Sequence, residues 1–262
     1  MNDNQGLYKL HTLSTKWGWV YGSDLISRQL YLIIKREKLK NIVEIGAGLG
    51  ISSFWIGQAL KENKTGSLHS FDSGKDSQKI LSQMRTIKKE LLEKNDELAL
   101  DKFPTKYYFN YLRETRTLLN LDSYIEFHCK KIHSMIDIIK EIPSDSKIDL
   151  VFSDFRHGPS DILDILSTFL PYMNENSHIL IDSVPSNDIS RLTIEQLIKD
   201  LNDSKIPSAM LSFDDKEHRW RNIQLVTQRK FKLNHIVEID SSHQNSTAWI
   251  SIEPIKYTVR SK

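Results

Sequence analysis

Short β-branched runs alternate with amphipathic stretches along most of this chain, and this alternation limits the possible folds more than any other feature. The runs have the length of buried strands, and the stretches between them place apolar residues at helical spacing. Parallel strands need a crossover connection, which is usually a helix. The sequence therefore predicts an α/β fold with a seven-stranded, mostly parallel sheet, helices on both faces and an antiparallel C-terminal hairpin.

The elements can be placed by residue number. Five parallel strands are expected at 41–45, 67–71, 123–128, 148–153 and 177–181. Helices are expected at 23–38, with Ser23 as N-cap, and at 51–60, 131–142, 160–173 and 189–202. Two further strands, 208–213 and 221–226, are expected to form a hairpin around a charged turn that contains His218. In that turn His218 is either solvated or able to reach a substrate.

A single domain over residues 1–262 is expected, with three additions to its core. Residues 1–40 would form an N-terminal lid and helix, because the aromatic segment 17–22 suits either a hydrophobic lid or core packing. Residues 73–122 make a long crossover, in which 77–100 reads as one long helix and 102–120 is aromatic and basic. This insert is either a cap over a ligand or a solvated excursion. Residues 230–262 form a tail with short strands at 235–239 and 248–252, which pair across a dimer or fold back on their own sheet.

Composition excludes several classes of protein. The chain has 36 Lys and Arg against 34 Asp and Glu, which does not support a protein dedicated to coating DNA. Its one cysteine, Cys129, excludes an intramolecular disulfide and points to a reducing, cytoplasmic compartment. No apolar run approaches the ~18 residues that a membrane span requires, and the N-terminus has no apolar signal core.

The strongest local motif follows the first predicted strand. Glu44 precedes Gly46-Ala47-Gly48-Leu49-Gly50, and a helix is expected to begin directly afterwards. Glycine allows tight turns and close approach of the backbone to a ligand, and a helix N-terminus presents N–H groups. The spacing differs from the dinucleotide fingerprint G-x-G-x-x-G, but the strand–turn–helix setting indicates a nucleotide-like ligand.

This E-x-G-x-G-x-G motif resembles the first motif of the class I S-adenosylmethionine-dependent methyltransferases, and the similarity extends over about residues 41–226. The resemblance implies a Rossmann-like fold and S-adenosylmethionine as cofactor. It places the glycine loop against the methionine part of the cofactor and gives the acidic residue a role at its amino end. The cofactor-binding set implied in and after this loop is Glu44, Gly46, Ala47, Gly48, Gly50 and Ser52.

The same resemblance assigns residues after the second and third strands. In this family an acidic residue at the end of the second strand binds both ribose hydroxyls, and Asp72 occupies that position here. The alternative is that Asp72 only caps a loop. The family contacts adenine with residues after the third strand, here His128, Cys129 and Lys130. Cys129 is expected to be a small packed residue rather than a nucleophile, and His69 a structural residue within its strand.

Acidic residues at the ends of the fourth and fifth strands suggest a metal site. The family's metal-dependent O-methyltransferases hold a divalent ion between an Asp after the fourth strand and an Asp-Asn or Asp-Asp pair after the fifth. This chain offers Asp154, Asp182 and Ser183 for Mg²⁺, and the serine hydroxyl is a weaker ligand than an amide or carboxylate oxygen. Without a metal, Asp154 would contact the cofactor or substrate and Asp182 would cap the strand.

Methyl transfer to oxygen needs a base for the acceptor's proton. His157 is the first candidate because an imidazole titrates near neutral pH, and Asp154 is the alternative. The expected function is O-methylation of a small hydroxylated metabolite, with a possible homodimer and no membrane partner. Two alternatives remain: an RNA or DNA methyltransferase, for which the basic and aromatic insert would serve, and a non-catalytic cofactor-binding module.

Overall fold

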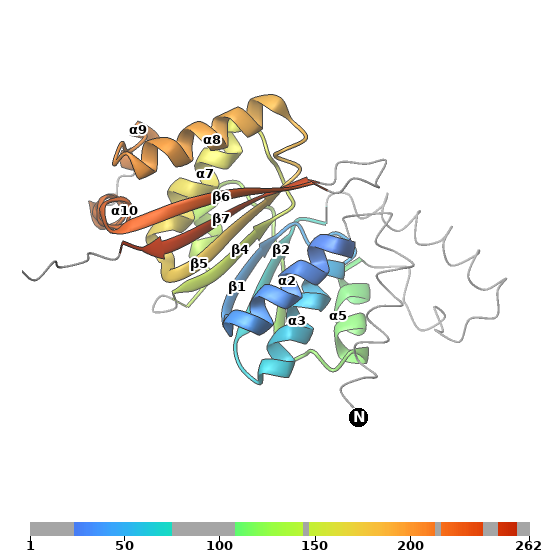
Figure 1. Ribbon diagram of the computed structural model, residues 1–262. Coiled ribbons are helices and arrows are strands. Elements are labelled where there is room, and N and C mark those ends of the chain that lie inside the picture. The colour runs from blue at the N-terminus through green and yellow to red at the C-terminus, as the bar shows by residue number, and fades with distance from the viewer. Residues whose placement is uncertain (1–23, 75–107, 144–146, 213–215, 238–245, 256–262) are drawn as a thin grey trace, which may run out of the picture. The chain divides into compact units, whose positions relative to one another are not determined.

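The computed structural model describes residues 24–74, 108–143, 147–212, 216–237 and 246–255 (Figure 1). The chain divides into two compact units, Met1–Ile132 and His133–Lys262. Ser23, the aromatic segment 17–22 and the predicted helix at 77–100 lie outside the described residues. The expected single domain, with its lid and insert, stays a prediction.

The first unit contains three parallel strands. β1 (Asn41–Ile45) pairs with β2 (Ser67–Asp72), and β2 pairs with β3 (Ile125–Cys129). β1 is buried from Ile42 to Ile45, as expected for a strand covered on both faces. These strands end within one or two residues of their predicted bounds, and the parallel ladder brings their carboxyl ends to one edge.

Three described helices belong to this unit: α2 (Asp24–Glu37), α3 (Ile51–Asn63) and α5 (Tyr108–Leu118). α3 is buried along most of its length because α2 packs on it and it contacts β2 and β3 (Figure 1). A helix that is apolar on most sides is typical of such an interior position. α5 contacts β3 and supplies the buried side chains of Tyr108, Tyr111 and Leu112.

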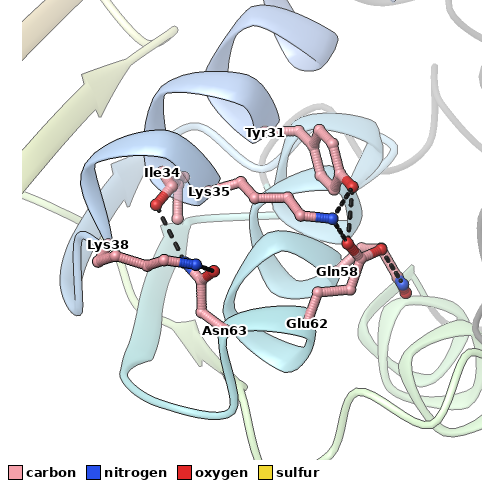
Figure 2. A network of polar contacts seen from close by, with 7 residues as sticks. All are labelled: Tyr31, Ile34, Lys35, Lys38, Gln58, Glu62 and Asn63. Carbon is pink, nitrogen blue, oxygen red and sulfur yellow. Dashed lines mark hydrogen bonds and ion pairs between the residues drawn. The ribbon is translucent and has the colours of Figure 1, made fainter.

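A polar network joins α2 to α3 (Figure 2). The Glu62 carboxylate, 8% exposed, accepts hydrogen bonds from the Tyr31 hydroxyl at 2.8 Å and the Gln58 amide at 2.9 Å, and it pairs with the Lys35 ammonium. Burial alone would raise the pKa of Glu62, but the hydrogen bonds from Gln58, Lys35 and Tyr31 outweigh it and lower the pKa. Beside these contacts, the Asn63 amide donates to the Ile34 carbonyl oxygen at 3.0 Å.

Replacing Glu62 by alanine is expected to lower the free energy of unfolding by about 2–3 kcal/mol, because partly buried donors lose a charged acceptor. Urea unfolding at pH 7 measures this change. Since the folded pKa of Glu62 is lowered, its contribution is present at neutral pH and is lost as the pH falls through that pKa. Glu114→Ala on the exposed side of α5 is the matched control, and an equal loss in both variants would contradict the prediction.

The second unit contains four strands. β4 (Ile148–Ser153) runs parallel to β5 (Met173–Asp182), which pairs antiparallel with β7 (Ser246–Pro254), and β7 pairs antiparallel with β6 (Arg229–Val237). The described residues thus contain a seven-stranded, mostly parallel sheet with an antiparallel C-terminal hairpin, which confirms the predicted fold class. The other elements of this unit are α6 (Ile136–Ile139), α7 (Pro159–Phe169), the 3₁₀ helix η2 (Leu170–Tyr172), α8 (Asp188–Asn202), α9 (Ser208–Leu211) and α10 (Lys216–Gln228).

The hairpin is formed by other residues than the sequence predicts. The predicted strands at 208–213 and 221–226 are wrong, because the structure has helices α9 and α10 there. His218, expected in a turn, is buried on α10, and its Nε2 lies 3.0 Å from the carbonyl oxygen of Ser167. This position makes His218 a packed residue of the helix rather than a solvated one.

The tail supplies the hairpin, and it folds back on its own sheet. β6 pairs with β7 alone among the described strands, so its outer side is an edge. Its exposed positions include Lys230 and Lys232, and the Lys232 ammonium lies 2.6 Å from the Glu253 carboxylate on β7. None of the described helices is both long and apolar enough to cross a membrane.

Candidate functional site

The glycine motif forms the turn between β1 and α3. Gly46, Gly48 and Gly50 all have positive φ angles, of 93°, 50° and 79°. Residues with a side chain rarely adopt these values, so three glycines in alternation are needed to build this turn. At Gly50 space is also limited, because a Cβ atom would lie 2.8 Å from the Leu112 side chain.

Glu44 lies beneath this loop and is completely buried. Its carboxylate accepts hydrogen bonds from the hydroxyls of Ser52 and Ser70, both at 2.5 Å, and from that of Ser53. Burial raises the pKa of Glu44, and the three hydroxyls offset part of this rise. The three contacts tie the end of β1 to the first turn of α3 and to β2, so Glu44 has a scaffolding position under the loop.

Asp72 ends β2 and faces the same loop. Its Oδ2 accepts backbone N–H bonds from Ala47 at 3.1 Å and Gly48 at 3.3 Å, and its Oδ1 accepts one from Gly74 at 2.7 Å. Asp72 therefore caps the glycine loop, which is the alternative that the sequence left open beside ribose binding. A carboxylate has about four lone-pair positions, so these three bonds leave about one for a ribose hydroxyl, and a diol would have to share or displace one of the N–H bonds.

Helix α5 holds the loop from another side. The Tyr108 hydroxyl donates to the Gly48 carbonyl oxygen at 2.5 Å, and the Tyr111 hydroxyl donates to the Leu49 carbonyl oxygen at 3.1 Å. These residues and Leu112 lie at i, i+3 and i+4, which places them on one helix face. Burial, followed by the nearby Asp72 carboxylate, raises the pKa of Tyr108, so its phenol stays protonated and keeps donating.

Tyr108→Phe is expected to weaken S-adenosylhomocysteine binding by about 5- to 10-fold, because one hydrogen bond that holds the loop is lost. Titration calorimetry measures this change. Tyr124→Phe, just before β3, is the control and should leave the affinity unchanged. Unchanged affinity in Tyr108→Phe would show that the loop keeps its conformation without this contact.

The end of β3 lies beside Asp72. Cys129 is the register partner of Asp72, and the Lys130 N–H donates to the Asp72 carbonyl oxygen at 2.9 Å. Cys129 is exposed, so the expectation of a packed residue is wrong: it occupies the end of a strand that pairs with β2 alone among the described strands. The ring of His128 stacks on that of Phe71, with centroids 4.3 Å apart. Contact of His128, Cys129 and Lys130 with adenine remains a prediction.

The predicted catalytic and metal residues belong to the second unit. Asp154 is exposed just after β4, and His157 is half-buried three residues later. Asp182, at the end of β5, accepts hydrogen bonds from the hydroxyls of Ser183 and Thr247, each at 2.9 Å. Burial raises the pKa of Asp182, and the two hydroxyls, followed by the nearby His157, offset only part of this rise.

Ser183 has a left-handed backbone with φ of 60° and is buried. Its hydroxyl donates to Asp182, as the Thr247 hydroxyl does, so this pair of donors faces the carboxylate that the sequence assigns to a metal. An ion at Asp182 would use the lone pairs that these bonds leave, and the metal site of Asp154, Asp182 and Ser183 remains a prediction. The sequence does not predict the hydrogen bond from Thr247, because only the pairing of β5 with β7 brings this residue next to Asp182.

Sequence comparison adds a family to this geometry. A family model described as a methyltransferase domain matches residues 43–184, more than half of the chain. The chain belongs to this methyltransferase family. The expectation of an S-adenosylmethionine-dependent methyltransferase of class I is thereby confirmed. No curated protein is similar enough in sequence to count as a relative.

Solved structures share the fold of this methyltransferase at low sequence identity. The O-methyltransferase TomG from Streptomyces achromogenes, involved in tomaymycin synthesis and solved with S-adenosylmethionine, has a TM-score of 0.52 and 15% identity, with 93% of this chain and 89% of TomG covered. An O-methyltransferase from Bacillus cereus, solved with S-adenosylhomocysteine, has a TM-score of 0.53 and 13% identity, with 95% and 91% covered. At these identities the similarity concerns the fold.

Proposed function

We propose that this methyltransferase transfers the methyl group of S-adenosylmethionine to a hydroxyl oxygen of a small metabolite. One observation supports binding of the cofactor. Asp72 accepts hydrogen bonds from the glycine loop, and Glu44 beneath the loop holds Ser52 at the start of α3. Positive-φ glycines leave the loop backbone open to close approach, and Asp72 is a carboxylate suited to a diol. The O-methyltransferase names of the similar structures support oxygen as the acceptor atom.

When bound, the cofactor supplies an electrophilic methyl group on a sulfonium. The residues of this chain must then orient the acceptor and remove its proton. His157 is the proposed base: it would accept the hydroxyl proton on a ring nitrogen as the acceptor oxygen takes the methyl group, with S-adenosylhomocysteine as the leaving thioether. Asp182, at the end of β5, would stabilise the resulting imidazolium through its negative charge. Asp154 is the alternative base, and Mg²⁺ at Asp154 and Asp182 is the alternative means of acidifying the hydroxyl.

The experiment separates cofactor binding from catalysis. Methyl transfer to a panel of hydroxylated metabolites is measured with and without a chelator, for wild type, His157→Gln and Asp154→Asn. His157→Gln should lower kcat by about 100-fold or more and leave S-adenosylhomocysteine affinity unchanged. His235→Gln, an exposed histidine on β6, is the matched control and should retain full activity.

The other outcomes point to the alternatives. Wild-type activity in His157→Gln would remove the histidine from the mechanism, and a loss confined to Asp154→Asn would make Asp154 the base. Activity abolished by the chelator and restored by Mg²⁺ but not by Zn²⁺ would favour Mg²⁺ at Asp154 and Asp182. Tight S-adenosylhomocysteine binding without turnover of any acceptor would indicate a binding module. Methylation of RNA, with binding that weakens steeply with salt, would move the acceptor to nucleic acid.

A further inference from the structure

A second group of potential metal ligands lies on the first unit, on β2 and β3. His69 is on β2, and Glu126 and His128 are on β3. His69 Nδ1 lies 3.1 Å from His128 Nε2 and 3.5 Å from one carboxylate oxygen of Glu126, whose other oxygen lies 3.9 Å from His128 Nε2. Among the described residues this is the one group of three histidine, cysteine or acidic side chains close enough to hold an ion together.

The strand register explains why the three side chains meet. His69 pairs with Glu126, and residues two apart on a strand point to the same face, so His128 lies on the face of Glu126. The two histidine side chains are each 13% exposed, whereas Glu126 is 63% exposed. The group therefore has two shielded imidazoles on its inner side and a carboxylate toward solvent, through which an ion could enter.

We propose that His69, His128 and Glu126 form a binding site for a divalent transition-metal ion of the Zn²⁺ type. Imidazole nitrogen and carboxylate oxygen both bind Zn²⁺ at about 2.0–2.2 Å, and tetrahedral ligands at that distance lie about 3.3 Å from one another. The 3.1 Å between the two nitrogens matches that spacing, and a rotation of the exposed Glu126 carboxylate would bring one of its oxygens to it, since one donor atom from each residue already lies within 4.8 Å of the others. Three protein ligands leave a fourth position to water, and the two nitrogens favour Zn²⁺ over Mg²⁺, which prefers oxygen.

The surroundings fit this assignment. The ring of Phe71 stacks on that of His128 with planes 8° apart, which fixes the orientation of one ligand before an ion arrives. Burial lowers the pKa of His69, and the neutral imidazole is the form that binds a metal. A hydrogen-bonded pair of neutral histidines is the competing explanation. This explanation accounts for the 3.1 Å contact between the two ring nitrogens, but it does not explain why the Glu126 carboxylate lies beside both rings.

An ion here would join neighbouring strands. β3 pairs with β2 alone among the described strands, and the ion would add a second link between them one to three residues before Asp72 and Cys129. Because folding brings the three ligands together, binding should also raise the thermal stability of the protein. The site shares no residue with the Asp154 and Asp182 group. It shares His128 with the residues predicted to contact adenine, so Zn²⁺ binding is measured without the cofactor.

The test uses tag-free, metal-stripped full-length protein. Zn²⁺ is titrated by calorimetry, Co²⁺ by visible absorption, and the midpoint of thermal unfolding is measured with and without Zn²⁺. Wild type should bind one Zn²⁺, show the intense visible bands of tetrahedral Co²⁺, and unfold at a higher temperature with the ion. His128→Gln and Glu126→Gln should each weaken Zn²⁺ binding by about 10- to 100-fold or more.

Two controls keep the result specific. His235 Nε2 lies 3.2 Å from a Glu195 oxygen, so His235→Gln removes another histidine–glutamate pair and should leave Zn²⁺ affinity unchanged. Cys129→Ser should also leave it unchanged, although this exposed thiol is the neighbour of His128. Glu126 is exposed, so its glutamine variant should fold normally, as circular dichroism would show. Equal Zn²⁺ binding by wild type and both ligand variants, or no binding by wild type, would overturn the proposal.

Discussion

Replacing Asp72 by alanine is expected to weaken S-adenosylhomocysteine binding by about 100-fold, because hydrogen bonds to a charged acceptor contribute roughly 1.5–3 kcal/mol each. This carboxylate has one role in the structure and a second in our proposal. It accepts the N–H groups of Ala47, Gly48 and Gly74, and by our proposal it accepts both ribose hydroxyls. Titration calorimetry measures the affinity, and Asp188→Ala, with an aspartate 87% exposed at the start of α8, is the control.

The two tasks of Asp72 can be separated with the 2′-deoxy analogue of S-adenosylhomocysteine. If Asp72 binds the diol, wild type should prefer the natural ligand by about 10-fold, because one charged hydrogen bond is missing with the analogue. Asp72→Ala should then bind both ligands equally. A preference of the same size in both proteins would leave Asp72 only its role in the loop. Unchanged affinity in Asp72→Ala would contradict both roles.

Glu44→Ala is expected to lower the free energy of unfolding by about 3–5 kcal/mol, because it leaves a cavity and removes the acceptor of buried hydroxyls. Three serines, Ser52, Ser53 and Ser70, donate to this one carboxylate. Urea unfolding followed by circular dichroism measures the loss. Glu114→Ala again serves as the exposed control, and a loss below about 1 kcal/mol in Glu44→Ala would show that the serines find other acceptors.

The pH dependence of Glu44→Gln gives a second measurement. Burial raises the folded-state pKa of Glu44, so its stabilising contribution is fully present below its unfolded pKa, near 4.3, and is lost as the pH rises through the folded pKa. Glutamine does not titrate. The advantage in unfolding free energy of wild type over Glu44→Gln should therefore shrink as the pH rises above the unfolded pKa. An advantage that grows with pH would mean that the serines hold the carboxylate ionised.

The sequence predicts the first four parallel strands closely. It places the start of β5 four residues too late, at 177 instead of Met173, and predicts the hairpin after α8 wrongly. β1 and β4 coincide with their predicted bounds because both are short, β-branched and buried. The sequence predicts a turn and a strand where α10 lies, because the start of this segment is charged like a turn and its end is apolar like a strand. The buried residues of α10, His218, Asn222, Leu225 and Val226, have helical spacing, which becomes visible only when the charged start is included.

The candidate site shows a similar division. Glu44, the glycines and Asp72 stand next to strand ends in the sequence, so their neighbourhood could be predicted from the order of elements. Ser70, Tyr108 and Thr247 could not, because each reaches its partner across a strand pairing or from a distant helix. The aromatic residues at helical spacing in 108–111 indicate a packed helix face. The sequence around them does not show that this face holds the glycine loop.

The lysines of β6 have a consequence for how copies of this protein behave at high concentration. A strand with an unpaired side can add a strand from another molecule, and repeated addition leads to aggregation. Lys230 and Lys232 are exposed on this edge, so two such edges approaching each other would bring like charges together. Exposed lysines on this edge are therefore expected to disfavour open-ended self-association of the strand.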